Sequence, residues 1–222
     1  MNYAVVIPAY NAARTIVETL DSVLAQSLQP SEIVVVDDGS TDNTVACVKA
    51  HPAAARIVSQ PNTGCGAATT HAIRLTSAPV IAGLDADDIW LPQKMAQQMA
   101  HLATLGPNAI SFTKSRQFHH GDSDRTKGEE RDALIRSSIV LHRATFDKVG
   151  PVIDPPGGSG DMVDWLGRAR AAGYSLHILP EVLMLRRIIA GSMTYRADDY
   201  SHRGYLSVAR AAIMRRRQAE QK

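Results

Sequence analysis

The chain has 222 residues, of which 45% are hydrophobic and 21% charged, a composition that accommodates one folded domain with at most a small terminal appendage. No apolar stretch approaches the roughly 20 residues that a membrane span needs, and the N-terminus lacks the basic and apolar regions of a secretory leader. We therefore expect a cytoplasmic protein with at most peripheral membrane contact. The formal charge is +2, and because the basic residues are dispersed apart from Arg215–Arg217, no nucleic-acid partner is expected.

Short apolar runs alternate with helical patterns over the first half of the chain. Runs rich in β-branched residues predict buried strands at residues 3–7, 32–36, 56–59 and 79–84. Apolar residues at helical spacing predict a helix after each of the first three strands and a further helix over residues 92–105. This alternation predicts an α/β fold in which helices cover both faces of a mostly parallel sheet.

The alternation of strand and helix patterns is less regular in the second half of the chain. Residues 117–132 are rich in charge, glycine and histidine, and we predict a mobile loop there, of the kind that covers a substrate. Strands are predicted at residues 138–141 and 175–179, with a helix over 161–172. An amphipathic helix with a basic end is expected over residues 199–217.

Carboxylates follow two of the predicted strands: Asp37 and Asp38 end one, and Asp85, Asp87 and Asp88 end another. Ligands of open α/β sheets bind beyond the carboxyl ends of the strands. The crowded acids of the second group repel one another, and Mg²⁺ or Mn²⁺ would relieve that repulsion while sharing its shell with the phosphates of a nucleoside-diphosphate donor. The alternative is that Asp87 or Asp88 caps a helix near Trp90 and that the turn at Asp38 is a simple connection.

Four segments together resemble the family 2 glycosyltransferases in order and spacing: VVIPAYN at 5–11, VVDDGSTD at 35–42, QPNTG at 60–64 and LDADD at 84–88. The resemblance is strong over residues 3–95 and looser to about Thr194. It implies a GT-A fold with a Rossmann-like sheet, and transfer of a sugar from a nucleotide-diphosphate donor with inversion at the anomeric carbon. A UDP-sugar is the favoured donor, and the acceptor is open among a glycan, a lipid-linked glycan, a peptide and a small molecule.

The resemblance also implies a domain division and a donor site. The GT-A domain would span residues 1–195, with a nucleotide-binding half at 1–110 and an acceptor-side half at 111–195, followed by a basic helical tail at 196–222. Asp87 would be the direct ligand of Mn²⁺ or Mg²⁺ on the donor diphosphate. Asp85 would lie nearer the ribose and also contact the metal. Asp38 would contact the base or ribose. The other implied donor-binding residues are Pro8, Ala9, Tyr10, Asn11, Asp37, Asn62, Gly64, Ala86 and Arg187.

An inverting transfer needs a general base that takes the acceptor's proton, and carboxylates suit that task. The place of the family's acidic pair is occupied by GDMVDW at 160–165, which offers the single acids Asp161 and Asp164 and has Met162 between them. The two acids share a helix face, and we favour Asp161 because it lies nearest the positive end of the helix dipole. The alternative is that Asp161 only caps the helix and that Asp164 is a surface residue.

Arg187 is predicted to bind the diphosphate through its planar donor fork, with a solvated strand-edge position as the alternative. The resemblance places a histidine near the metal soon after this arginine, and this chain has Ile189 there. Two further readings stay open. One is a nucleotide-sugar-binding protein without efficient turnover, consistent with Met162 and Ile189. The other is a nucleotidyltransferase, which the absence of a Gly-rich basic loop after the first strand disfavours.

Overall fold

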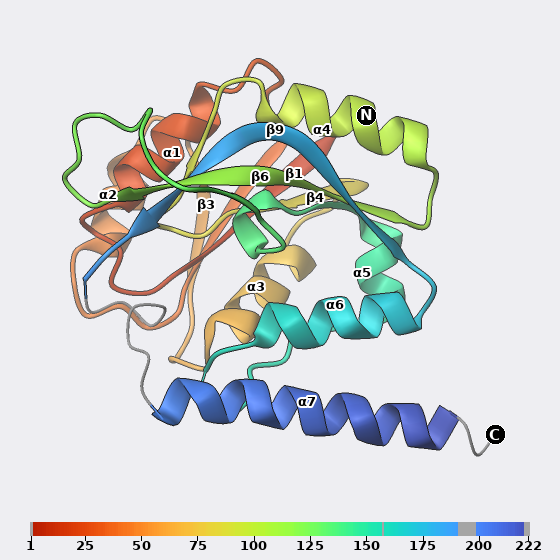
Figure 1. Ribbon diagram of the computed structural model, residues 1–222. Coiled ribbons are helices and arrows are strands. Elements are labelled where there is room, and N and C mark those ends of the chain that lie inside the picture. Colours follow the sequence, from red (N-terminus) through yellow and green to blue (C-terminus); the bar gives the residue numbers. More distant parts are fainter. Residues whose placement is uncertain (1, 157, 191–198, 220–222) are drawn as a thin grey trace.

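The computed structural model describes residues 2–156, 158–190 and 199–219, and the strands in these ranges form one curled sheet (Figure 1). Strand order is β3-β2-β1-β4-β8-β6-β9-β5, and β7 pairs with β6 outside this path. The strands are β1 (Tyr3–Ala9), β2 (Glu32–Asp37), β3 (Arg56–Ser59), β4 (Val80–Gly83), β5 (Ile89–Trp90), β6 (Ala109–His119), β7 (Glu130–Asp132), β8 (Val140–His142) and β9 (Ser175–Ile188).

Helices cover both faces of this sheet (Figure 1). Side chains alternate along β1, so that Val5 and Ile7 pack with α1, α2 and α4 on one face, while Ala4 and Val6 pack with α3, α5 and α6 on the other. The helices are α1 (Ile16–Leu24), α2 (Thr44–Ala50), α3 (Cys65–Arg74), α4 (Lys94–Leu105), the 3₁₀ turn η1 (Arg136–Ser138), α5 (Arg143–Val149), α6 (Asp161–Ala171) and α7 (Asp199–Ala219). The predicted α/β class is confirmed.

The parallel part of the sheet determines where a ligand can bind. β3, β2, β1 and β4 all run parallel, in a register that pairs Ala9 with Asp37 and Asp37 with Ser59. Their carboxyl ends therefore lie along one edge, and the segments that follow β1, β2 and β4 meet there. β8 joins β4 and β6 by antiparallel pairing, which the sequence patterns did not indicate.

Residues 117–132, predicted as a loop, are partly strand. β6 continues to His119, which pairs with Ile188 of β9, and β7 pairs with residues 114–116 of β6. The connection between the two strands is confined to residues 120–129. The prediction is wrong at both ends, because pairing with neighbouring strands outweighs a polar composition on a half-exposed surface. The strand predicted at 175–179 likewise extends to Ile188 beside β6.

α7 packs along α6 (Figure 1). A Cβ atom added to Gly204 of α7 would lie 2.2 Å from the Ser159 carbonyl oxygen, so the helix backbone touches the segment before α6. None of the described helices is both long and apolar enough to span a bilayer. The domain boundary predicted at residue 195 and the segment 191–194 lie outside the described residues, and the division into domain and tail stays a prediction.

Candidate active site

The candidate active site lies at the edge where β1, β2 and β4 end. Pro8 and Ala9 are buried strand residues, whereas Tyr10 and Asn11 follow the strand and are exposed. The turns after β2 and β4 flank this segment, and hydrogen bonds and ion pairs connect all three ends to α3 and α6. The structure thus gathers the segments that the sequence selected for donor binding.

Asn11 joins the end of β1 to the turn after β2. Its side-chain oxygen accepts a hydrogen bond from the Thr41 amide at 2.8 Å, and its own amide donates to the Ser40 hydroxyl at 2.8 Å. The φ angle of Asn11 is +48°, a region in which asparagine is enriched among non-glycine residues. Asp37 is buried and accepts a hydrogen bond from the Ser40 amide at 3.2 Å. Tyr10, the residue before Asn11, is 53% exposed.

Asp38 is a buried carboxylate that organises the turn after β3. It accepts hydrogen bonds from the amides of Thr63 and Gly64, at 3.0 and 2.9 Å, and from the Gln60 side chain at 2.8 Å. Asn62, within the same turn, is exposed. The structure therefore brings Asp38 and Gly64 together, but both Asp38 oxygens already serve the protein's own loop. Contact of Asp38 with a base or ribose stays a prediction.

Two residues of the acidic run hold the run in place. Asp88 is buried, and its carboxylate accepts a hydrogen bond from the Arg187 amide at 2.9 Å. Burial, followed by the charges of Asp87 and Asp85, raises the pKa of Asp88 well above its usual value. The Ala86 carbonyl oxygen accepts hydrogen bonds at 2.9 and 3.0 Å from two threonine hydroxyls, those of Thr15 and Thr19. Asp88 fastens β9 to this turn, and the reading of Asp88 as a helix cap is wrong.

Arg136 of η1 is a buried arginine that the sequence patterns did not select. One of its terminal nitrogens donates to Asp85 at 2.7 Å and lies 3.1 Å from the Cys65 sulfur. The other Asp85 oxygen accepts a hydrogen bond from the Ser137 hydroxyl at 3.1 Å. Burial opposes the charge of Arg136, but Cys65, Asp85 and Asp161 outweigh it and raise the pKa of the guanidinium. Both oxygens of Asp85 are therefore engaged within the protein.

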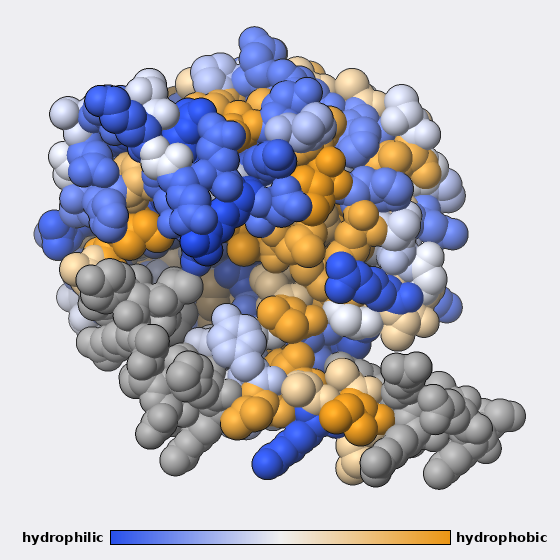
Figure 2. Space-filling model, in the orientation of Figure 1, coloured by the Kyte–Doolittle hydropathy of each residue, from blue (hydrophilic) through white to orange (hydrophobic). Residues whose placement is uncertain are grey.

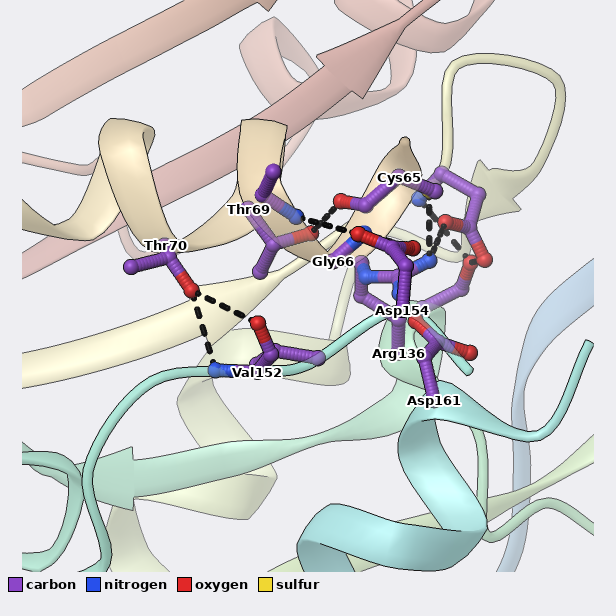
Figure 3. Close-up of polar contacts among 11 residues, drawn as sticks. Cys65, Gly66, Thr69, Thr70, Arg136, Val152, Asp154 and Asp161 are labelled. Carbon is purple, nitrogen blue, oxygen red and sulfur yellow. Dashed lines mark hydrogen bonds and ion pairs between the residues drawn. The ribbon is translucent and has the colours of Figure 1, made fainter. Parts of the chain in front are cut away.

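The two acids of α6 lie in different surroundings. Asp161 forms an ion pair with Arg136 and so joins the acidic cluster (Figure 3). Asp164 is buried and accepts a hydrogen bond from Arg168, one turn along the same helix, at 2.8 Å. The helix N-cap is Gly160, in the left-handed region at φ +100°. The alternative of a capping Asp161 and a surface Asp164 is wrong, and Asp161 is the acid that the structure brings to the site.

Asp154 anchors the segment that leads to α6. Its carboxylate accepts hydrogen bonds from the amides of Gly66 and Ala67, both at 2.8 Å, at the first turn of α3 (Figure 3). Amides in a first helical turn lack partners within the helix, and the helix dipole favours an anion there. Gly64 admits this contact, because a Cβ atom there would lie 2.5 Å from the Asp154 carboxyl carbon. The bond draws the chain before α6 against α3.

Asp87 is the least engaged acid of the run. Among the described residues, no other residue donates a hydrogen bond to its carboxylate. Burial, followed by the charge of Asp85, raises the pKa of Asp87 to about 6. No group of three or more His, Cys, Asp or Glu side chains in the described ranges is arranged to hold a metal. One free carboxylate fits a divalent cation that takes most of its ligands from donor phosphates and water.

Arg187 of β9 is 5% exposed, so its reading as a solvated strand-edge residue is wrong. Its guanidinium donates to the Asp87 carbonyl at 2.7 Å and to the Glu18 carboxylate at 2.5 Å, and lies 4.6 Å from the centre of the Phe118 ring. Glu18 also pairs with Arg125 of the 120–129 connection at 2.5 Å. Hydrophilic residues gather at the upper left of the space-filling view, where Figure 1 shows the 120–129 connection (Figure 2). A contact between Arg187 and a diphosphate stays a prediction and would compete with these bonds.

Three charged residues of the site were missed by reasoning from the sequence: Glu18, Arg136 and Asp154. Glu18 lies off the apolar stripe of its helix, which was its only signal. Asp154 precedes Pro-Pro-Gly and resembles an ordinary turn residue, and Arg136 stands in no recognisable motif. Their partners are distant in sequence, so only the fold reveals them.

The fold is that of the GT-A glycosyltransferases, as the resemblance implied. A structure of S. aureus TarS in complex with UDP-GlcNAc matches with a TM-score of 0.71 at 17% identity, over 89% of this chain and 62% of that one. The mannosyltransferase PcManGT from Pyrobaculum calidifontis, in complex with GDP-Man and Mn²⁺, matches with a TM-score of 0.71 at 21% identity, over 96% and 64%.

The chain belongs to glycosyl transferase family 2, whose family model matches residues 4–153. An uncharacterized glycosyltransferase of Nostoc sp. is 39% identical over 99 residues, which make up 43% of this chain and 31% of that protein. An uncharacterized glycosyltransferase of Rickettsia prowazekii is 33% identical over 212 residues, or 87% of this chain and 66% of that protein. The chain thus spans less than two thirds of the length of these relatives.

Proposed function

We propose that the protein is an inverting glycosyltransferase that moves a sugar from a nucleoside-diphosphate donor, with a UDP-sugar favoured, to an acceptor. One observation carries the proposal: beside Asp85, at the edge where the parallel strands end, Asp87 presents a carboxylate to which no other described residue donates a hydrogen bond. Breaking a sugar–diphosphate bond leaves negative charge on the diphosphate, which must be balanced. Membership of the family and the nucleotide-sugar complexes of TarS and PcManGT support this class of donor.

The acidic run fits Mn²⁺ or Mg²⁺ on the donor diphosphate. Asp87 would bind the ion directly, because no other residue in the described ranges donates to its carboxylate, whereas Asp85 is held by Arg136 and would lie nearer the ribose. When bound, the cation supplies charge neutralisation for the leaving diphosphate. Asp88 keeps the turn that carries Asp87 in place through its bond with the Arg187 amide.

Asp161 is the acid that we assign to the acceptor side. It lies in the same cluster as Asp85, at the start of α6, while Asp164 is turned to Arg168. As the acceptor hydroxyl attacks the sugar, its proton must pass to a base on the side away from the leaving diphosphate. The braced loops around Asn11 and Asp38 would hold the nucleoside at the other end of the site.

A donor screen tests the proposal. The thermal midpoint is measured with a panel of UDP- and GDP-sugars, with and without Mn²⁺, and the same mixtures are assayed for released nucleoside diphosphate. We expect a Mn²⁺-dependent rise and release with at least one donor. Asp87→Asn should lose the rise, while Asp147→Asn, an exposed aspartate of α5, is the matched control. Neither a shift nor release with any donor would contradict the proposal.

A second function, nucleotide-sugar binding without turnover, is favoured by the surroundings of Asp161. Its carboxylate is committed to an ion pair with Arg136, and Met162 stands where an acid was expected. This ion pair occupies the carboxylate that would have to accept the proton of the acceptor. A Mn²⁺-dependent rise without release of nucleoside diphosphate across the whole panel would favour this second function.

The acceptor and the cellular location complete the proposal. The 120–129 connection, tied to α1 by the pair between Arg125 and Glu18, is proposed to border the acceptor site. Candidates for the acceptor are a glycan, a lipid-linked glycan, a peptide and a small molecule. A cytoplasmic location, with at most peripheral membrane contact, is tested by fractionation of the source cells.

A further inference from the structure

A single buried guanidinium joins the donor side and the acceptor side of the site. Arg136 donates to Asp85, which follows β4, at 2.7 Å. Its other terminal nitrogen pairs with Asp161 at the start of α6 (Figure 3). The Arg136 side chain is 7% exposed, and the Asp161 side chain 16%. In the described ranges, neither acid has an ion pair with another cation. Asp85 and Asp161 are therefore held together by one residue.

The fold is built around this side chain. A Cβ atom at Gly83, the last residue of β4, would lie 2.7 Å from the Arg136 carbonyl oxygen and 3.0 Å from its Cγ atom. Ser137, the next residue of η1, binds Asp85 through its hydroxyl and its carbonyl accepts a hydrogen bond from the Trp90 ring. A buried charge is costly unless it is paired, so the two acids stabilise Arg136 as much as it stabilises them.

We propose that Arg136 is a positioning residue for sugar transfer. It holds Asp85 and Asp161 in one arrangement, so that donor and acceptor are correctly aligned. The inference rests on the proposed function. Arg136 acts through the two acids: Asp85 serves donor binding and Asp161 serves proton acceptance. Without the guanidinium the two carboxylates would repel each other and lose a shared anchor.

Kinetics of paired variants test this role. Arg136→Met removes the charge at similar side-chain length and should lower kcat about 100-fold and raise the donor KM, because both acids are released. Asp161→Asn should lower kcat alone. The double variant should have a kcat no lower than that of Asp161→Asn, since residues that act as one unit are not additive. If Arg136 were only structural, the two losses in kcat would multiply.

Arg143 provides the matched control. It is an arginine of α5 that donates to the carbonyl oxygens of Ala78 and Ile73, at 2.8 and 3.2 Å, and contacts none of the site's acids. Arg143→Met should lower the thermal midpoint but leave kcat and the donor KM within about twofold below that midpoint. Arg136→Lys keeps a charge without the fork that reaches two acids, and its activity should fall between the wild type and Arg136→Met.

The outcomes separate this inference from the proposed function. No turnover by the wild type with any donor removes the proposed function and, with it, the role of Arg136. With an active wild type, unchanged kinetics in Arg136→Met, or multiplied losses in the double variant, would overturn the role of Arg136 alone. If Arg136→Met does not fold, Arg136→Ala is assayed with added methylguanidinium: restored kcat supports the role, and no restoration in a folded variant that binds the donor overturns it.

Discussion

Two groups of aspartates lie along the same sheet edge, and the protein uses them differently. After β2, Asp37 and Asp38 are buried and their charges are met by backbone amides of neighbouring turns. After β4, Asp85 is met by an arginine and Asp87 by no other described residue. A carboxylate bound by amides is locked, because removing it leaves several buried donors unpaired. A carboxylate without such partners can take a cation, so we propose that the first group shapes the site and the second binds the cation of the donor.

The largest expected change in activity is at Asp161, which is paired with the second group of aspartates through Arg136. Asp161→Asn keeps an acceptor for Arg136 but removes the base, so kcat should fall about 1000-fold while Mn²⁺-dependent donor binding is retained. Asp164→Asn, on the same helix, should cost roughly 2 kcal/mol of unfolding free energy, because a charged hydrogen bond with Arg168 is weakened, and leave kcat nearly unchanged. Steady-state kinetics and urea unfolding measure both. The reverse pattern would assign the base to Asp164.

Asp87→Asn is the next effect in size. Loss of this direct ligand should weaken Mn²⁺-dependent donor binding by at least about 100-fold, since even the partners that orient metal ligands contribute up to that much. The variant should be no less stable than the wild type, because it removes repulsion with Asp85 and Asp88. Calorimetric titration of the donor with and without Mn²⁺ measures the change, with Asp147→Asn as control. Equal binding by Asp87→Asn would move the metal ligand to another acid.

Asp38→Ala should show the opposite behaviour, a loss of stability. The amides of Thr63 and Gly64 would lose their acceptor, which should lower the free energy of unfolding by about 2–3 kcal/mol. Asp38→Asn keeps one acceptor oxygen and should lose less. Urea unfolding curves give both values. If Asp38→Ala instead keeps full stability and loses only donor binding, the contrast between the two groups of aspartates fails.

The smallest effect concerns pH. The pKa of Asp87, raised to about 6, means that a growing fraction of this carboxyl is protonated as the pH falls through 6, and the cation must displace that proton. The rise in thermal midpoint caused by donor and Mn²⁺ should therefore be full above about pH 7 and shrink below 6, by about tenfold in affinity per pH unit. Without Mn²⁺ the raised pKa of Asp87 lowers the free energy of unfolding. This loss develops as the pH rises from the usual aspartate range to 6. Asp87→Asn should abolish the first trend and only reduce the second, because the raised pKa of Asp88 contributes to the second as well. Persistence of the first trend would contradict the assignment.

The fold of the first half could be predicted because local pattern and tertiary pairing agree there. The apolar run that became β1 is buried on both faces, as its composition indicates. The region of β6 and β9 differs, since His119 and Ile188 are strand residues only because they pair with each other. Such pairing is a property of two distant segments and leaves little trace in either one.

The site divides in the same way. Several acids close together at a strand end were enough to identify the run from Asp85 to Asp88 as a site. The sequence alone did not show which role each acid has. The role of Asp88 depends on the Arg187 amide, and that of Asp85 on Arg136. Neither partner can be read from local composition, because an ion pair is determined by where the fold places two side chains.

The contact between Gly83 and Arg136 has a consequence for protein engineering. Any side chain at position 83 would collide with both the backbone and the side chain of the arginine. A segment exchange that imports a β4 ending in alanine would therefore force η1 to shift and should disturb the pairing of Arg136 with its two acids. The shortest contact is with the carbonyl oxygen of residue 136, which every residue carries, so a library that randomises position 83 should return glycine as the active solution.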